Sequence, residues 1–148
     1  MSGISVSDEL LELYEQVKLR DAHKYILFSL KKQDDAGRTF DWAIDHRADK
    51  DTDIGNNKTH WDAMVSSLPE DSAMFVVFDF TFNKADGRLV KKLLLIKWCP
   101  DTVHFRVKPV IGATYQTLKD KLTGIAADVQ CVDTDDLEYE AIQKLLAQ

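Results

Sequence analysis

Cysteine is scarce in this chain of 148 residues, and the two that are present, Cys99 and Cys131, lie in apolar segments without a paired-cysteine or cysteine–histidine spacing. This pattern argues against a disulfide framework and a zinc site, and it predicts a reducing, cytosolic environment. No apolar run approaches the roughly 20 residues that a membrane-spanning helix needs, and the N-terminus reaches Asp8 and Glu9 without a hydrophobic stretch. We therefore expect neither secretion nor insertion into a membrane.

The sequence also lacks the motifs of common catalytic and nucleotide-binding sites. Its four histidines, His23, His46, His60 and His104, form no H-E-x-x-H or comparable metal spacing. No serine has a G-x-S-x-G setting, and no glycine-rich loop precedes a helix as a phosphate-binding loop would. The residues thus give no support for a resident metal, a bound nucleotide or catalytic hydrolysis.

Positive charge is in the minority, because 25 Asp and Glu residues against 19 Lys and Arg residues give a net charge of -6 and a pI near 5.1. The chain therefore has no global positive field to hold a nucleic-acid backbone, and general binding to DNA or RNA is disfavoured. Its length and its hydrophobic content of 45% predict one soluble globular domain, residues 1–148, with an independent core.

The first third of the chain predicts a helix followed by a β-hairpin. A serine and two acidic residues at 7–9 can begin the helix, and the apolar residues after them recur at helical spacing. Lys24 to Leu30 and Thr39 to Ile44 are rich in β-formers and flank turn residues, which predicts two paired strands. The polar segment from Asp45 to Lys58 is expected to be an exposed loop.

Two nearly continuous apolar runs, Ala73 to Phe80 and Leu93 to Cys99, are typical of central strands that are covered on both faces. The other expected elements are a helix that Thr59 caps and Pro69 stops, a helix from near Ala113 to Ile125, a strand from Asp128 to Val132, and a helix from Thr134 or Asp135 with Leu137, Ala141 and Leu145 facing inward. The whole order of helices and strands predicts an α/β domain with a mixed sheet between helices.

A local excess of positive charge follows the second apolar run. Arg106 and Lys108 alternate with Val107, and Lys119 and Lys121 lie on the expected solvent face of the next helix. Against the acidic background, these residues form a basic patch that suits an acidic partner surface. The residues alone leave open whether the patch binds a partner or is an ordinary solvated face.

Four segments of the chain, taken in order, form a distinctive set. They are S-G-I-S-V-S-D-E at 2–9, A-M-F-V-V-F-D at 73–79, W-C-P-D-T and R-V-K within 98–108, and L-T-G-I and D-V-Q within 122–130. In order and spacing they closely resemble the actin-depolymerising factor (ADF)/cofilin family, and the match spans essentially the whole chain. The resemblance implies a single ADF-homology (gelsolin-like) domain, with a central mixed sheet flanked by helices on both faces.

The resemblance also implies a cytoplasmic, monomeric actin-binding protein of the cytoskeleton that has no cofactor and no enzymatic activity. One face would bind actin monomers and filaments alike, and it would comprise Ser2, Gly3, Ile4, Ser5, Val6, Arg106, Lys108, Thr117, Lys121 and Asp128. A second face would serve filaments only, and it would comprise Lys84, Arg88, Lys91, Lys92 and, on the final helix, Lys144. Ser2 would be a site of regulatory phosphorylation, and phosphoinositide lipids would compete for the basic residues.

The chain also departs from the family pattern. Where the family usually has K-M-I-Y-A-S-S-K, residues 108–115 read K-P-V-I-G-A-T-Y, so Ile111 replaces an aromatic residue and Tyr115 replaces a lysine. Two functions are open: a cofilin that depolymerises and severs filaments, and an ADF-homology protein that binds filament sides or the branch-nucleating complex without severing. The retained basic pair and N-terminal segment favour the first, and an unrelated enzyme is a distant third.

Overall fold

The computed structural model describes residues 4–19, 23–32, 40–49 and 57–147. In chain order its elements are α1 (Asp8–Lys18), β1 (His23–Lys32), β2 (Phe40–Asp49), α2 (Asn57–Ser66), β3 (Met74–Asn83), β4 (Leu89–Trp98), α3 (Lys108–Lys121), β5 (Ile125–Cys131), a 3-10 turn (Thr134–Leu137) and α4 (Tyr139–Ala147). Apart from the 3-10 turn, this is the order that the hydrophobic pattern predicts.

The strands form one five-stranded sheet in the order β2-β1-β3-β4-β5. β1 pairs antiparallel with β2 and with β3, and β3 pairs antiparallel with β4. β5 runs parallel to β4, because α3 carries the chain back along the sheet between these two strands. The sheet is therefore mixed, which confirms the predicted fold class.

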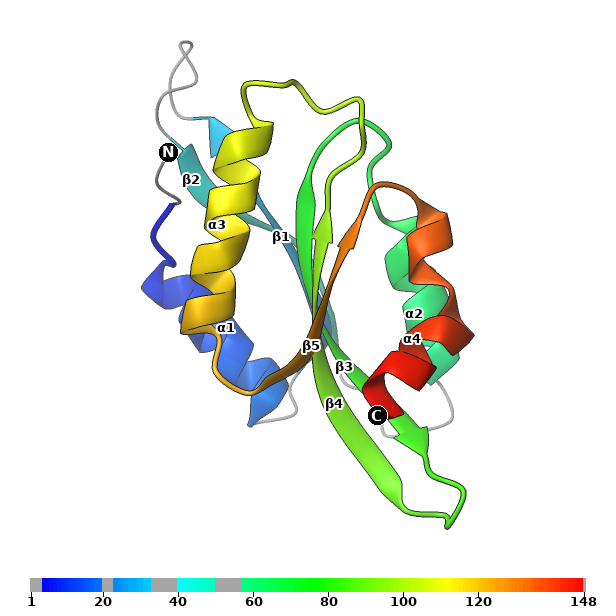
Figure 1. Cartoon of the computed structure of the whole chain (residues 1–148). Coiled ribbons are helices and arrows are strands. Elements are labelled where there is room, and N and C mark those ends of the chain that lie inside the picture. The colour runs from blue at the N-terminus through cyan, green and yellow to red at the C-terminus, as the bar shows by residue number, and fades with distance from the viewer. Residues whose placement is uncertain (1–3, 20–22, 33–39, 50–56, 148) are drawn as a thin grey trace.

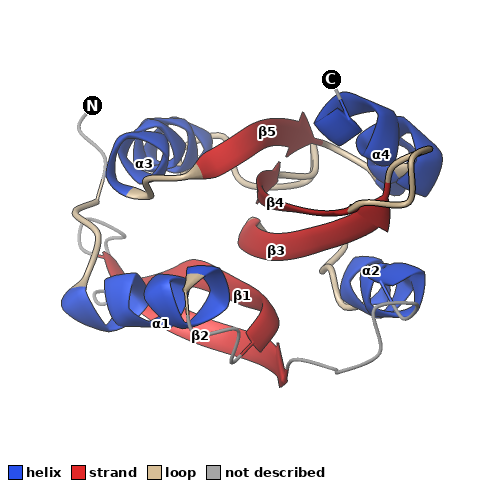
Figure 2. Ribbon diagram, turned by 90° about the horizontal axis from the view of Figure 1, so that it is seen from below, coloured by secondary structure: helices blue, strands red, loops and turns tan. Residues whose placement is uncertain are grey.

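Helices cover both faces of the sheet, with α1 and α3 on one face and α2 and α4 on the other (Figures 1 and 2). The buried apolar side chains accordingly form two cores. β3 supplies both, because successive side chains of a strand point to opposite faces: Phe75 and Val77 pack under α1 and α3, whereas Phe78 and Phe80 pack under α2 and α4. The sheet thus separates two independent packing environments.

α1 begins as the sequence predicts and is tied to the turn after α3. Ser7 Oγ accepts a hydrogen bond from Leu10 N at 3.2 Å, which caps the helix. Further along, Tyr14 Oη and Lys18 Nζ donate to the carbonyl oxygen of Thr123 at 2.5 and 2.8 Å. Burial, with a smaller contribution from the neighbouring Glu15 charge, raises the pKa of Tyr14 to about 12.

The prediction of an exposed loop from Asp45 to Lys58 is wrong at both ends. β2 continues to Asp49 on the edge of the sheet, where Asp45 accepts a hydrogen bond from Ser29 Oγ at 2.6 Å. An edge strand admits charged side chains because part of its surface stays in water. The last two residues of the segment already belong to α2, so Thr59 lies inside that helix and does not cap it. Residues 50–56 lie outside the described part of the chain.

α3 and β5 both begin earlier than predicted. α3 begins at Lys108 and not near Ala113, because Pro109 occupies its first turn, where the missing N–H is not needed. The helix ends at Lys121, and Gly124 adopts a φ of 95° in the turn that follows. Ile125 therefore starts β5 and does not belong to the helix.

The expected final helix is divided into a 3-10 turn and α4, because the backbone between them is extended (ψ 126°). The break shifts the helical phase. Leu137 is buried as predicted, but Ile142 and Leu146 take the inward positions of α4, and Ala141 and Leu145 are exposed. The inward assignment of those two residues is therefore wrong.

Candidate functional site

The segment between β4 and α3 is folded into a turn that fixes the basic pair. Val107 N donates to the His104 carbonyl at 2.9 Å, and Arg106 N donates to His104 Nδ1 at 3.1 Å. Val103 anchors the segment because its side chain is buried in the core under α1 and α3. The backbone that carries Arg106 and Lys108 is therefore held both by its own hydrogen bonds and by a core contact.

Arg106 and Lys108 extend from this turn with positive charges that can interact with an external group. Arg106 is exposed, and its guanidinium carbon lies 5.7 Å from the centre of the Phe105 ring. Lys108 is half-buried, and its Nζ donates to the Asp101 carbonyl at 3.1 Å. Among the described residues neither cation forms an ion pair with a carboxylate. Both can therefore bind an external acidic group.

Phe105 is a feature of this turn that the sequence analysis missed. Its side chain is 71% exposed, and its ring stacks on His104 with a centroid distance of 4.7 Å. An exposed aromatic residue beside an arginine is a common composition of binding hot spots. The sequence carries a signal for it, an aromatic residue within a short polar segment next to the basic pair.

The N-terminal segment, as far as the structure describes it, contacts both α3 and β2. Ile4 N donates to Thr114 Oγ1 at 3.1 Å, and the Ser5 carbonyl accepts a hydrogen bond from Trp42 Nε1 at 2.8 Å. Val6 packs against the core under α1 and α3. These contacts bring three of the predicted site residues onto the same surface as α3, whereas residues 2–3 lie outside the described part.

The C-terminal half of α3 supplies two more of the predicted residues. Lys121 is exposed, whereas Thr117 is half-buried and its Oγ1 donates to the Ala113 carbonyl at 3.2 Å. Since a helix rises about 1.5 Å per residue, α3 separates Lys108 from Lys121 by about 20 Å. The predicted monomer-and-filament face is therefore an elongated strip with positive charge at both ends.

Asp128 lies on β5 beside α3, and its carboxylate is engaged within the molecule. It accepts a hydrogen bond from Tyr115 Oη at 2.6 Å and lies 3.6 Å from Lys119 Nζ. Burial, followed by the bond to Asp128 and the charge of this carboxylate, raises the pKa of Tyr115. The residue that replaces a usual family lysine thus fastens α3 to β5.

The β3–β4 hairpin carries the basic residues of the predicted filament face. Lys84 N donates to the Arg88 carbonyl at 2.9 Å, and Gly87 takes the positive φ of 87° that the turn requires. Arg88 N donates to Asp86 Oδ1 at 3.0 Å, and Arg88 Nε donates to Asp86 Oδ2 at 2.7 Å. The backbone bond, followed by the side-chain bond, lowers the pKa of Asp86. Arg88 is therefore paired within its own turn, whereas Lys84 is exposed and forms no ion pair within the described ranges.

The remaining predicted filament residues lie at different places around the hairpin. Lys91 Nζ lies 3.7 Å from Asp79, a buried carboxylate, whereas the alternation of the strand directs Lys92 to the opposite face of the sheet. Lys144 is exposed on α4. Two residues of α4 and five from the hairpin line a shared cleft of about 510 Å³: Gln143, Ala147, Phe82, Asn83, Lys84, Ala85 and Asp86. α4 and the hairpin therefore form one continuous surface.

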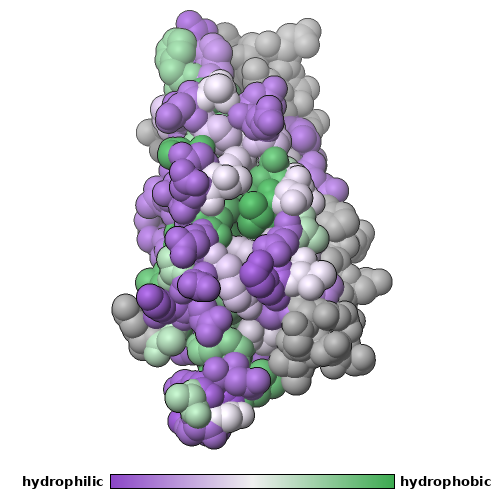
Figure 3. Space-filling model, turned by 90° about the vertical axis from the view of Figure 1, so that its right-hand side faces the viewer, coloured by the Kyte–Doolittle hydropathy of each residue, from purple (hydrophilic) through white to green (hydrophobic). Residues whose placement is uncertain are grey.

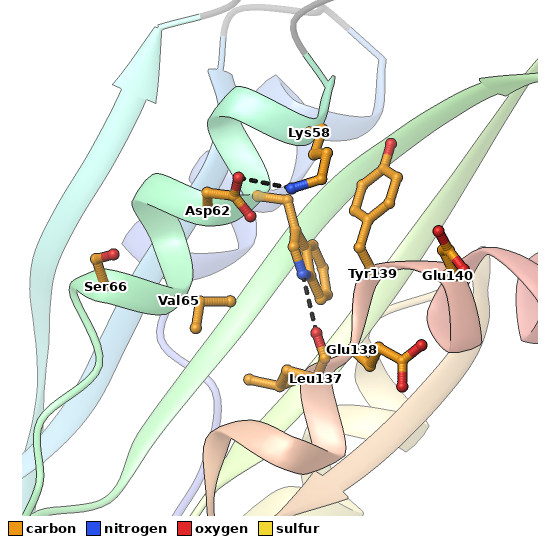
Figure 4. A pocket seen from close by; sticks show the side chains of 9 residues that line it. Lys58, Asp62, Val65, Ser66, Leu137, Glu138, Tyr139 and Glu140 are labelled. Atoms are coloured by element: carbon orange, nitrogen blue, oxygen red, sulfur yellow. Dashed lines mark hydrogen bonds and ion pairs between the residues drawn. The ribbon is translucent and has the colours of Figure 1, made fainter.

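A second cleft, of about 570 Å³, lies where α2 meets the beginning of α4 (Figure 4). In it Lys58 Nζ lies 2.9 Å from Asp62 and 5.7 Å from the centre of the Tyr139 ring, and Trp61 Nε1 donates to the Leu137 carbonyl at 3.1 Å. Seen from this side, the molecule is mostly hydrophilic, with hydrophobic atoms visible in a central hollow (Figure 3).

The described residues contain no group of three or more histidine, cysteine or acidic side chains that could hold a metal ion. The thiols of Cys99 and Cys131 are free and buried, in the two different cores. Burial raises the pKa of Cys99, and it raises that of Cys131 to about 12. No described helix is long and apolar enough to cross a membrane.

Comparison with known proteins identifies the family. The cofilin/tropomyosin-type actin-binding protein family matches residues 3–147. This chain belongs to that family. It is similar to cofilin of Schizosaccharomyces pombe, with 30% identity over 141 residues that cover 95% of this chain and 93% of the relative. It is also similar to actophorin of Acanthamoeba castellanii, with 28% identity over 144 residues that cover 97% and 95%.

Solved structures agree with the fold of this cofilin-family member. The crystal structure of a Streptomyces griseoflavus cofilin is similar with a TM-score of 0.78 and 25% identity, covering 99% of this chain and 98% of that chain. Plasmodium berghei actin depolymerization factor 2 is similar with a TM-score of 0.80 and 20% identity, covering 100% and 99%. The resemblance drawn from the four sequence segments is therefore confirmed.

Proposed function

We propose that this cofilin-family chain is a cytoplasmic, monomeric actin-binding protein that binds actin monomers and filaments and promotes filament depolymerisation and severing. One observation carries the proposal: Arg106 and Lys108 project from a turn held by hydrogen bonds, next to the N-terminal segment and α3, and neither pairs with a carboxylate of the described chain. A fixed pair of cations on an otherwise acidic molecule suits an acidic partner surface.

The monomer-and-filament face would combine charge with apolar contact. Arg106 and Lys108 would each supply a charge-assisted hydrogen bond, and Lys121 would extend the contact to the far end of α3. Phe105 would add apolar area at the centre of the basic turn. Thr117 would lie on the same strip, and Ile4, Ser5 and Val6 would border it.

The filament face would be formed by the hairpin and α4. Lys84, Lys92 and Lys144 would supply its free cations, with Arg88 and Lys91 beside them. The proposed mechanism is a population shift: a protein that binds an altered filament twist more tightly than the ordinary one favours the altered state, which weakens contacts between neighbouring subunits. Severing and depolymerisation follow from this differential affinity, and no catalytic step is involved.

One observation favours the second candidate, an ADF-homology protein that binds filament sides or the branch-nucleating complex without severing. Arg88 is paired with Asp86 and Lys91 lies near Asp79, so part of the positive charge of the filament face is compensated within the molecule. Losing one or two exposed charge contacts costs about 0.5–2 kcal/mol, which is roughly a two- to thirtyfold weaker filament affinity. Filament affinity would then be lower than monomer affinity.

Two regulatory inputs belong to the proposal. Phosphorylation of Ser2 would place about two negative charges close to Ile4, which is bonded to α3, and would repel an acidic partner. Phosphoinositide membranes would compete for Arg106, Lys108 and Lys121, each cation contributing about 1 kcal/mol near an anionic surface. Lys119 would contribute less than these, since it lies near Asp128.

The test is cosedimentation with actin filaments, with the supernatant assayed for monomer, for wild type and the double variant Arg106→Ala/Lys108→Ala. We expect the variant to lose both activities, because each charge-assisted contact is worth about 1.5–3 kcal/mol. It should stay folded, because Arg106 is exposed and Lys108 is only half-buried, with one hydrogen bond to the Asp101 carbonyl. The control is Lys31→Ala, which removes an exposed cation of β1 outside both faces. Unchanged actin affinity in the folded Arg106/Lys108 variant would refute the assignment.

A further inference from the structure

Asn57 is the centre of a buried hydrogen-bond network on the face covered by α2 and α4. It is the first residue of α2 and is only 4% exposed. Its Oδ1 accepts from Lys24 Nζ at 2.7 Å and from Thr81 N at 2.9 Å, and its Nδ2 donates to Tyr139 Oη at 2.7 Å. One amide group thus joins four elements: β1, α2, β3 and α4.

Each partner sits where the regular structure is interrupted. Lys24 lies at an irregularity in the β1–β2 register, between His23 and Tyr25, and such bulges redirect a side chain. Thr81 lies on β3 beyond Phe78, the last residue of β3 that pairs with β1. Asn57 therefore takes the place of a strand neighbour for the Thr81 backbone. The polar groups lie beside aromatic side chains, with Lys24 Nζ 5.3 Å from the centre of the Phe78 ring.

The network reaches the two parts of the proposed filament face. Tyr139 is the first residue of α4, and Thr81 immediately precedes the residues of β3 that lead into the hairpin turn. Asn57, Thr81, Tyr139 and Gln143 contribute to one cleft of about 370 Å³, which meets the α4–hairpin cleft at shared residues. The Trp61–Leu137 bond holds the preceding 3-10 turn to α2 as well (Figure 4).

Polar networks inside a protein restrict packing to arrangements that satisfy every donor and acceptor, because an unpaired buried group is costly. An apolar α2–α4 contact would tolerate small shifts of α4, whereas a 2.7 Å bond between Asn57 and Tyr139 does not. The network therefore fixes the orientation of α4 more narrowly than the surrounding apolar packing would.

We propose that Asn57 and Tyr139 are positioning residues, which hold α4 against the β3–β4 hairpin so that both halves of the filament face meet one partner. This inference rests on the proposed function and deepens it. Neither residue needs to contact actin. Without the bond, α4 samples more orientations, and filament binding must select the competent one. The monomer-and-filament face lies on the other side of the sheet and does not depend on this bond.

The test compares Tyr139→Phe with Tyr115→Phe. Each variant removes one tyrosine hydroxyl from a part-buried hydrogen bond, to Asn57 in α2 or to Asp128 in β5. For Tyr139→Phe we expect filament affinity to fall by roughly two- to tenfold, the range that one neutral hydrogen bond supplies, with monomer affinity unchanged. Tyr115→Phe should not lower the ratio of filament to monomer affinity. A fall of this ratio in both variants would overturn the inference.

Two further measurements separate positioning from simple destabilisation. Asn57→Asp should keep wild-type filament binding, because its carboxylate can accept from Lys24, from Thr81 N and from the Tyr139 hydroxyl. Hydrogen exchange should show faster exchange of the α4 amides in Tyr139→Phe, with α3 protected as in wild type. Unchanged exchange in α4, or a loss of filament binding in a folded Asn57→Asp protein, would overturn the inference.

Failure of this inference is distinguishable from failure of the proposed function. If wild type binds actin and Arg106→Ala/Lys108→Ala does not, while Tyr139→Phe binds filaments like wild type, only the positioning role is refuted. If wild type binds neither monomers nor filaments, the proposed function fails and this inference fails with it.

Discussion

Phe105 gives the most quantitative prediction of the proposed function. Its side chain is 71% exposed, and a phenylalanine buries roughly 200 Å² when it is fully covered, so about 140 Å² is available to a partner. At about 25 cal/mol per Å², complete coverage would contribute about 3.5 kcal/mol. Incomplete coverage reduces this to about 2–3 kcal/mol, so Phe105→Ser should weaken monomer binding by roughly 30- to 150-fold.

The assay is a titration of fluorescently labelled actin monomer, combined with thermal unfolding of the free protein. Phe105→Ser should unfold at the wild-type temperature or slightly above it, because the ring has little contact with the core. Leu19→Ser is the matched control, since Leu19 is 69% exposed after the C-terminal end of α1, away from the basic turn. If Phe105→Ser binds monomer as tightly as wild type, the exposed ring is not part of the interface and the calculation is refuted.

Three other perturbations follow from the described contacts. Asp86→Asn should raise filament affinity about two- to fivefold with monomer affinity unchanged, because it frees the charge of Arg88; equal affinities by cosedimentation would contradict this. Ser2→Asp should weaken both activities, and wild-type binding would argue against a phosphorylation switch. The raised pKa of Tyr14 favours its neutral form in the folded protein, so this stabilisation is complete below pH 10 and is lost as the pH rises through about 12. Chemical denaturation between pH 10 and about 12 should show a smaller decrease in the free energy of unfolding for Tyr14→Phe than for wild type.

The sequence predicts the order of helices and strands because periodicity is a local property. β3 is the clearest case: nine of its ten residues are buried, as expected for a central strand with helices on both faces. Element boundaries were less accurate where tertiary context decides them. Asp45 reads as a loop residue, and only its place on the edge strand makes it a strand residue. The phase of α4 depends on the extended backbone after Leu137, which no periodicity of the segment specifies.

The candidate site was predictable to a similar degree. The family resemblance identified Arg106 and Lys108, and the structure describes both as cations without an ion-pair partner in the described chain. The family resemblance did not reveal that Asp128 accepts a hydrogen bond from Tyr115, because these residues meet only when α3 packs beside β5. The Asn57 network was equally hidden, since its members come from four elements that are far apart in the sequence.

Because the sheet separates the two cores, each core of such a protein can evolve nearly independently of the other. Substitutions in packing environments that share no side-chain contacts have nearly additive effects on stability. Substitutions at Trp61 or Ile142 can therefore alter the packing under α2 and α4. The packing around Leu118 and Tyr115, on the other face of the sheet, stays the same. Mutations on the α2 and α4 side can therefore change the affinity for one form of a partner, while the binding surface on the α1 and α3 side is kept.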